Sequence, residues 1–440
     1  MNNSLSKSLS TVQLWSIVVG MVISGMYFGW NYALKYTSPM GFVIAVVVVT
    51  VFYLTFIFSF AEMSTAIPNA GASQEYAKRT MGKFGGYIAG FSCIVEYLFA
   101  VPAIALSIGA YINFLVPAIP TVVAAVLFYL IFVVVNLLNI SLAASVELII
   151  TIVAIVGIIL YVGVGMFKVN PANFVKSSVP TGGISGIFST IPFAIWFYLG
   201  VEGGAVAAEE CKHPKKQIPK AFLGGVLTLV VMALLTLFVT VGISDVTKIS
   251  SVDSPLPSAL AMAFGSGSII SKILSFVGLF GLIASMHGLI IGYSRQTYAM
   301  AREGYLPKFL SYTSRKHKAP VFAVIIPSAV GLIFVLTQNT AAIITISSIG
   351  AVVLYIMSMI SFFLLRKKEP EVERPYQVSS LAVPGVALVI AVLFLIAVTY
   401  ANLSMMLWVM VAYAVAILFY FAYTAATNAA ETGKSVGESN

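Results

Sequence analysis

Three ionisable side chains lie near the middle of long apolar runs, where lipid excludes an unpaired charge. Glu96 and Glu202 are acids, and His287 is an imidazole. An ionised group at the centre of a bilayer costs about 3 kcal/mol on insertion scales, unless it meets a cation, a proton or hydrogen-bond donors. Histidine can bind and release a proton near pH 7. We therefore expect the acids to bind a cationic group and His287 to act in proton coupling, with helix-to-helix hydrogen bonding as the alternative for all three.

Two of the apolar runs are interrupted by glycine close to their centres. Residues 23–26 read Ile-Ser-Gly-Met, and residues 198–204 read Tyr-Leu-Gly-Val-Glu-Gly-Gly. Transporters built from two inverted repeats bind substrate at mid-membrane, where helices in matching positions unwind and leave backbone groups free. These runs are the first and sixth along the chain, so the pattern predicts two unwound helices around a binding site. Close helix packing is the alternative reading for any single glycine.

The residues at and beside the breaks form the candidate site. Packing is the ordinary role of an aromatic ring there, but a ring face also suits an ammonium group. We expect substrate binding by Ile23, Ser24, Gly25, Tyr27, Glu96, Trp196, Tyr198, Gly200 and Glu202. We expect coupling or gating by His287, Ser285, Glu62 and Arg295. The sequence predicts no catalytic residue, metal site or cofactor.

Transmembrane helices must position these side chains. Hydrophobic residues make up 60% of the 440 residues and charged residues 9%, against about 25% charged residues in soluble domains. Long apolar runs also exclude a β-barrel, whose strands are short and alternating. We predict an all-α polytopic membrane protein with 12 transmembrane helices, because runs of bilayer-spanning length are centred near residues 24, 51, 101, 132, 157, 199, 230, 284, 331, 354, 392 and 413.

The basic residues predict the orientation of these helices. With the N-terminus inside, 19 of the 24 lysines and arginines fall on the cytoplasmic side, and the exceptions are Lys35, Lys168, Lys176, Lys248 and Lys272. Positive charge resists translocation. We therefore expect a multi-pass protein of the inner (plasma) membrane with both termini cytoplasmic. The expected organisation is a tail at 1–11, a transmembrane transporter domain at 12–425 and a tail at 426–440.

Three longer stretches resemble the amino acid, polyamine and organocation (APC) transporter superfamily. Residues 61–82, with Glu62 and Pro68, are similar to the loop after its second helix. Residues 200–219 resemble its sixth helix and the loop that follows, and residues 293–307 resemble the end of its eighth helix. The resemblance implies secondary transport by alternating access in a five-plus-five inverted-repeat fold with broken helices 1 and 6. It places the repeats at about 12–167 and 187–365, with two additional helices at about 381–425.

A narrower resemblance concerns the substrate. Residues 23–31, 94–97 and 287–296 look most like bacterial ethanolamine permeases. Amino acid carriers of the superfamily usually have glycine at the first position of the first break, where this chain has Ile23, and that departure weakens the case for a carboxylate ligand. We therefore expect import of a small amine, ethanolamine above all. The alternative is an amino acid permease of the same superfamily, for uptake or exchange of neutral or cationic amino acids.

The coupling ion and competing classes complete the expectations. Some proton-coupled relatives carry a lysine in the fifth helix, which this chain lacks, and sodium sites of this fold use hydroxyls where Ser285 stands. We favour proton coupling or facilitated exchange. His213, His287 and His317 are far apart and form no His-Glu-x-x-His motif, so an enzyme is disfavoured. A sensor or channel on the same fold stays open, and the expected partners are the small-molecule substrate and the lipid bilayer, not nucleic acid, with the oligomeric state undecided.

Overall fold

The computed structural model describes residues 9–69, 71–138, 144–175 and 182–437. Lys7 and Lys176, both used in the orientation argument, lie outside these ranges. Within them the protein contains helices and no strand, with isolated bridges only at Leu9–Cys211 and Thr313–Pro320. The all-α prediction is confirmed for this part of the chain.

The elements follow one another with short connections. In chain order they are α1 (Thr11–Val22), α2 (Ser24–Tyr27), η1 (Trp30–Lys35), α3 (Pro39–Ala66), α4 (Ala72–Leu115), α5 (Thr121–Leu137), α6 (Ala144–Met166), η2 (Pro171–Phe174), α7 (Gly183–Ile195), η3 (Val201–Glu210), α8 (Pro214–Ile243), α9 (Val246–Ile249), α10 (Pro255–Phe264), α11 (Ile269–Arg302), η4 (Lys308–Ser311), α12 (Val321–Thr337), α13 (Thr340–Lys368), α14 (Ala382–Ala401) and α15 (Leu403–Gly437).

Eight described helices are long and apolar enough to cross a membrane, namely α3, α4, α6, α8, α11, α13, α14 and α15. A ninth span results if α1 and the segment Ser24–Lys35 are taken together. The remaining apolar helices, α5, α7, α10 and α12, have only 10–17 residues. Every predicted run thus contains a helix, but the runs near residues 132, 199 and 331 form shorter helices than the prediction required.

Both glycine-containing runs are interrupted in the structure. Helix α1 ends at Val22 and α2 begins at Ser24, with a bend of 42° between them. Helix α7 ends at Ile195, and the 3-10 helix η3 begins only at Val201. Gly200, which precedes η3, has φ +90, a conformation that glycine adopts without the steric cost met by other residues.

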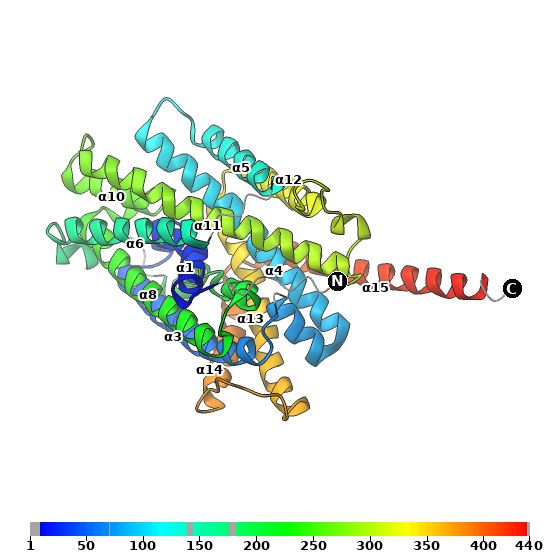
Figure 1. Cartoon of the computed structure of the whole chain (residues 1–440). Coiled ribbons are helices and arrows are strands. Elements are labelled where there is room, and N and C mark those ends of the chain that lie inside the picture. Colours follow the sequence, from blue (N-terminus) through cyan, green and yellow to red (C-terminus); the bar gives the residue numbers. More distant parts are fainter. Residues whose placement is uncertain (1–8, 70, 139–143, 176–181, 438–440) are drawn as a thin grey trace.

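Helices α4 and α13 form the most extensive contact between any two elements of the described chain. Figure 1 shows α5 and α12 side by side at one edge of the molecule, where they are in contact, and α15 projecting from the bundle. Helix α15 extends to Gly437, through residues that the sequence led us to expect as a tail. Residues 438–440 of that tail lie outside the described ranges.

One end of the bundle is closed by contacts of η1 with the last residue of α9 and the segment that follows it. The Asn31 side-chain amide donates to the Ile249 and Val252 carbonyls at 2.8 and 2.9 Å. The Tyr32 hydroxyl donates to the Asp253 carboxylate at 2.6 Å. These contacts bring the chain after Lys35 and the chain after Lys248 together, as expected for two loops on the same side of a membrane.

Candidate substrate site

Glu96 and Glu202 lie together in the bundle, although they are far apart in the sequence. Tyr97, the neighbour of Glu96, is 105 positions from Glu202. Glu96 lies on α4 and is 0% exposed, and Glu202 lies in the first turn of η3 and is 3% exposed. The Tyr97 hydroxyl donates to Glu202 Oε1 at 2.8 Å. The Tyr355 hydroxyl on α13 lies 3.4 Å from Glu96 Oε1 and 3.3 Å from Glu202 Oε2. Helices from both halves of the chain therefore assemble one buried pair of acids.

This acid pair has fewer hydrogen-bond donors than two carboxylates need. The single proton of Tyr355 can be donated to only one of the two carboxyl groups at a time. Glu96 Oε2 is buried and has no hydrogen-bond partner among the described residues. Two carboxylates sharing a desolvated site repel each other unless a proton or a cation neutralises one of them. The arrangement can therefore hold a proton or an ammonium group, either of which would supply the partner that Glu96 Oε2 lacks.

Tyrosine rings form one wall of this site. The Tyr53 hydroxyl lies 3.1 Å from that of Tyr355, and its ring centroid lies 4.9 Å from that of Tyr198. Tyr198 is held in turn by a 2.7 Å hydrogen bond between its hydroxyl and that of Thr50. Phe52 and Phe56 pack against Tyr355 from the other side. The wall combines ring faces with hydroxyls, a surface that suits a small cation.

The first break packs directly against the second. A Cβ added at Gly25 would lie 2.3 Å from the Trp196 carbonyl oxygen, so only glycine permits this approach. Ser285 on α11 closes the other side, because its hydroxyl accepts from the Ser24 N–H at 3.1 Å and donates to the Gly20 carbonyl at 2.7 Å. Ile23 is fully buried between them. The predicted backbone site for a carboxylate is thus occupied by Ser285 and Trp196 in this conformation.

Trp196 contributes a free donor beside the break. Its Nε1–H is buried and has no hydrogen-bond partner among the described residues. The ring lies edge-on to Phe28, with centroids 5.4 Å apart, and covers Gly29, where an added Cβ would lie 2.3 Å from Nε1. A buried donor without a partner is costly. Trp196 Nε1 and Glu96 Oε2 are thus a buried donor and a buried acceptor that both lack a partner among the described residues.

Other predicted residues lie away from the acid pair. The Tyr27 hydroxyl donates to the Ala154 carbonyl on α6 at 2.6 Å. His287 faces α5, where its Nδ1 lies 3.4 Å from the Asn136 amide nitrogen. Arg295 is exposed near the end of α11. The structure therefore brings Ile23, Ser24, Gly25, Trp196, Ser285, Tyr198, Gly200, Glu96 and Glu202 into one region and separates Tyr27, His287 and Arg295 from it.

Glu62 forms an ion cluster at the end of α3. It is 1% exposed and accepts from Arg366 Nε at 2.8 Å and Nη2 at 2.6 Å. Arg374 Nε lies 3.7 Å from Glu62 Oε1, and the Val378 N–H donates to Oε2 at 2.8 Å. This cluster, Glu62 with Arg366 and Arg374, fixes the connection between α13 and α14 against α3.

A small cavity of about 20 Å³ leads away from Glu202. It is lined by Gln74, Cys93, Tyr97, Glu202, Gln296 and Leu354, among others. That volume holds about one water molecule, so it is too small for a substrate. The acid pair is therefore nearly closed on this side.

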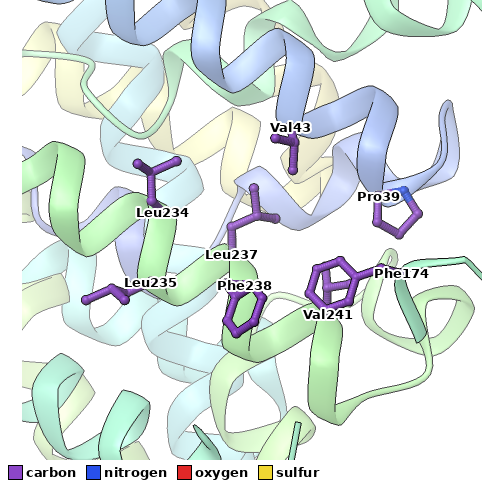
Figure 2. A pocket seen from close by; sticks show the side chains of 8 residues that line it. All are labelled: Pro39, Val43, Phe174, Leu234, Leu235, Leu237, Phe238 and Val241. Carbon is purple, nitrogen blue, oxygen red and sulfur yellow. The ribbon is translucent and has the colours of Figure 1, made fainter. Parts of the chain in front are cut away.

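A larger cavity, of about 310 Å³, lies elsewhere, between α3, η2 and α8. Figure 2 shows its apolar lining, with Pro39 and Val43 from α3, Phe174 from η2 and the α8 side chains Leu234, Leu235, Leu237, Phe238 and Val241. Since it holds no ionisable group and no polar side chain, it does not suit a charged solute. The larger volume therefore does not coincide with the buried acid pair.

Sequence reasoning identified Tyr198 but missed Tyr53, Tyr97 and Tyr355. Tyr97 directly follows Glu96, and Tyr355 lies at the centre of the tenth apolar run. A tyrosine hydroxyl in the middle of an apolar run could have indicated a site residue. The chain has 21 tyrosines, however, and the sequence does not show which of them contacts an acid. Which tyrosine faces an acid depends on helix rotation.

Comparison with known proteins agrees with this architecture. The model of the amino acid permease family matches residues 9–423. The branched-chain amino acid permease BcaP of Bacillus subtilis (strain 168) is 22% identical and aligns over 96% of this chain and 94% of its own length. The methylthioribose transporter of the same strain is 24% identical and aligns over 96% of this chain and 94% of its own length. The serine/threonine exchanger SteT of that strain is also 24% identical, over 86% of this chain and 87% of its own length. The chain belongs to the amino acid permease family and is a multi-pass membrane transporter.

Proposed function

We propose that the protein is a secondary transporter that imports a small solute with an ammonium group, and that Glu96 and Glu202 bind that group. The carrying observation is the buried acid pair with an unpartnered oxygen at Glu96. Twelve transmembrane helices in two inverted repeats, with α1–α2 and α7–η3 as the broken pairs, would place this pair where such folds bind substrate. The repeats at 12–167 and 187–365 and the two additional helices at 381–425 are part of this proposal.

An amino acid is the first candidate substrate. The relatives named as a branched-chain amino acid permease and a serine/threonine exchanger support it. The Trp196 Nε1–H would then donate to the substrate carboxylate while Glu96 accepts from its ammonium group. The exposed fractions of these side chains are close to zero, so binding requires α1–α2 or η3 to move apart.

Ethanolamine is the second candidate, on a specific observation. The Ser24 N–H already donates to the Ser285 hydroxyl, and Gly25 packs against the Trp196 carbonyl. The first break therefore has no room for a carboxylate in this conformation. Ethanolamine has an ammonium group and a hydroxyl but no carboxylate, and thus needs less space. We expect it to compete for the same acid pair.

We assign the coupling proton to the acid pair and not to His287. Replacement of the proton by the substrate ammonium group would keep one of the two carboxyls neutralised at each stage of the cycle. His287 packs against α5 beside Asn136 and Phe132. Uphill uptake driven by a proton gradient should therefore survive His287→Gln.

The test is tracer uptake by the purified protein in liposomes. The amines tested are leucine, serine, lysine and ethanolamine. Methylthioribose, which has no ammonium group and is the solute in the name of one relative, serves as the comparison. We expect Glu96→Gln and Glu202→Gln each to weaken transport of the true amine substrate at least about 30-fold, since unpairing a buried charge costs about 2 kcal/mol or more. Glu373→Gln, at a side chain 77% exposed, is the matched control. Uptake of methylthioribose without uptake of any amine would refute the proposal.

A further inference from the structure

We propose that residues 72–81 form a hinged flap that closes the passage from the cytoplasm to Glu202, with the contacts of Gln74 and Lys78 to α11 as its latch. The flap gates the site proposed above and in that respect rests on the proposed function. It adds a moving element that the acid pair itself does not require. The side of the membrane follows from the expected cytoplasmic position of this basic segment.

The cavity shows where the passage is blocked. Glu202 and Tyr97 line its inner end, while Gln74 and Gln296 line the end nearest the start of α4. Its volume of about 20 Å³ admits about one water molecule. A substrate can leave Glu202 by this route only if Gln74 and Gln296 separate.

The latch joins the flap to α11. The Gln296 amide donates to the Gln74 carbonyl oxygen, and the Gln74 amide donates to Glu303 Oε2 at 3.3 Å. Lys78 pairs with Glu303 at 3.0 Å. The two glutamine side chains lie over Gly90 of α4, where an added Cβ would come within 2.9 Å of both. The glutamine pair is thus buried, while its charged neighbour Glu303 is partly exposed.

A separate set of contacts ties the flap to α13. The Ser358 hydroxyl donates to that of Ser73 at 3.0 Å, and the Lys368 ammonium donates to the Thr80 carbonyl at 2.6 Å. Arg79 pairs with Glu369 at 2.5 Å. Gln74 of the flap and Gln296 of α11 both line the cavity, and Leu354 of α13 lines it as well. On this proposal, opening breaks the Gln74–Gln296 contact, while the contacts to α13 persist. We therefore expect the flap to move together with α13 and away from α11.

Both ends of the flap have backbone conformations suited to a hinge. Gly82 interrupts α4 with φ +79 and ψ −174, which separates residues 72–81 from the long remainder of the helix. This region is open essentially only to glycine. At the other end Ala72 has φ +40, an uncommon value for a residue with a Cβ. No atom lies within 4 Å of a Cβ added at Gly82, so an alanine there would act through its backbone conformation and not through a steric clash.

Cys93 provides a built-in reporter, because its side chain lines the cavity. We suggest the full-length protein with Cys211→Ser, which leaves Cys93 as the only thiol. The probe is a cationic methanethiosulfonate applied to inside-out vesicles, and the readout is the rate of mixed-disulfide formation, with Cys93→Ser as the blank. The assay needs no substrate, so its failure and a failure of the uptake experiment are independent results.

We expect Gln296→Ala and Glu303→Gln each to raise the labelling rate about five-fold, the change that corresponds to one lost hydrogen bond. Glu303→Gln changes a partly exposed side chain and guards against a variant that fails to fold. Glu369→Gln, on the α13 side, is the matched control and should leave the rate within two-fold. Gly82→Ala should also raise the rate, since alanine disfavours the closed conformation.

Three results would overturn the flap. The first is an unchanged rate in both latch variants. The second is an equal rise in Glu369→Gln, which would mean that the α13 contacts are the latch. The third is faster labelling from the opposite side of the membrane. An unchanged rate in Gly82→Ala would contradict the hinge at that residue.

Discussion

Replacement of Glu62 should destabilise the protein more than replacement of an acid in an exposed ion pair, such as Glu373. Its two oxygens accept from Arg366 Nε and Nη2 and from the Val378 N–H at 2.6–2.8 Å. Arg374 is 8% exposed and Arg366 28% exposed. In Glu62→Ala, both guanidinium groups would lose their only carboxylate partner among the described residues while staying largely out of water.

The magnitude follows from that burial. Removing one partner of a buried ion pair costs about 3–5 kcal/mol, because the remaining charge is left uncompensated. The Val378 hydrogen bond adds about 1 kcal/mol. Arg374 also donates to four backbone carbonyls, those of Leu365, Glu369, Pro370 and Val372, which offset part of its desolvation. We therefore expect about 3 kcal/mol for Glu62→Ala and less for Glu62→Gln, which keeps an acceptor.

The assay is thermal unfolding in detergent, followed by the fraction that stays monodisperse after heating. Glu373→Gln removes a salt bridge to Lys215 in which the side chains are 77% and 56% exposed, so it should cost less than about 1 kcal/mol. A midpoint for Glu62→Ala equal to that of the control would refute the view that the Glu62 cluster fixes the α13–α14 connection. Normal stability with lost transport would instead make Glu62 a gating residue, as the sequence suggested.

Two further predictions concern the breaks and the end of the bundle where Tyr32 contacts Asp253. Gly25→Ala should abolish uptake while the protein stays monodisperse, because a Cβ 2.3 Å from the Trp196 carbonyl forces the two breaks apart; uptake within two-fold of wild type would contradict this contact. Burial raises the pKa of the Asp253 carboxyl above its ordinary value, against the hydrogen bond from Tyr32 and the charge of Lys35. The folded state therefore holds this proton more tightly than the unfolded state, so the stability it contributes is complete below about pH 4 and is lost as pH rises through the raised pKa. Asp253→Asn should remove this decline from the pH profile of the thermal midpoint. Asp245→Asn should instead remove a decline towards low pH, because the hydrogen bond from Thr247 lowers the pKa of Asp245. Identical profiles for the wild type and both variants would refute the assignment.

Much of the fold follows from one-dimensional patterns in the sequence. Apolar runs of about 20 residues are sufficient to locate the helices, and Gly200 marks a break because no other residue adopts φ +90 as readily. Run length misjudged the helices near 132 and 331, because an apolar run does not end where its helix ends. Pro120 and Pro320 stand just before α5 and α12, and each of these helices has only 17 residues.

The site was predictable only in part. Glu96 and Glu202 were identifiable because a carboxylate in an apolar run has few ordinary explanations. Their contact with each other through Tyr355 was not, since it depends on the rotation of α4 and α13 about their axes. The same uncertainty applies to His287, whose position at mid-run suggested the site and whose helix face points to α5.

The narrow cavity beside Glu202 also bears on what the protein does when no substrate is present. A hydrated passage from an acid pair to the cytoplasm would let protons hop along a file of water molecules. The space of about 20 Å³ holds about one water molecule, which is too few for such a file. If transport is coupled to protons as proposed above, an idle transporter in this conformation would not leak them, and the proton gradient would be dissipated only by completed turnovers.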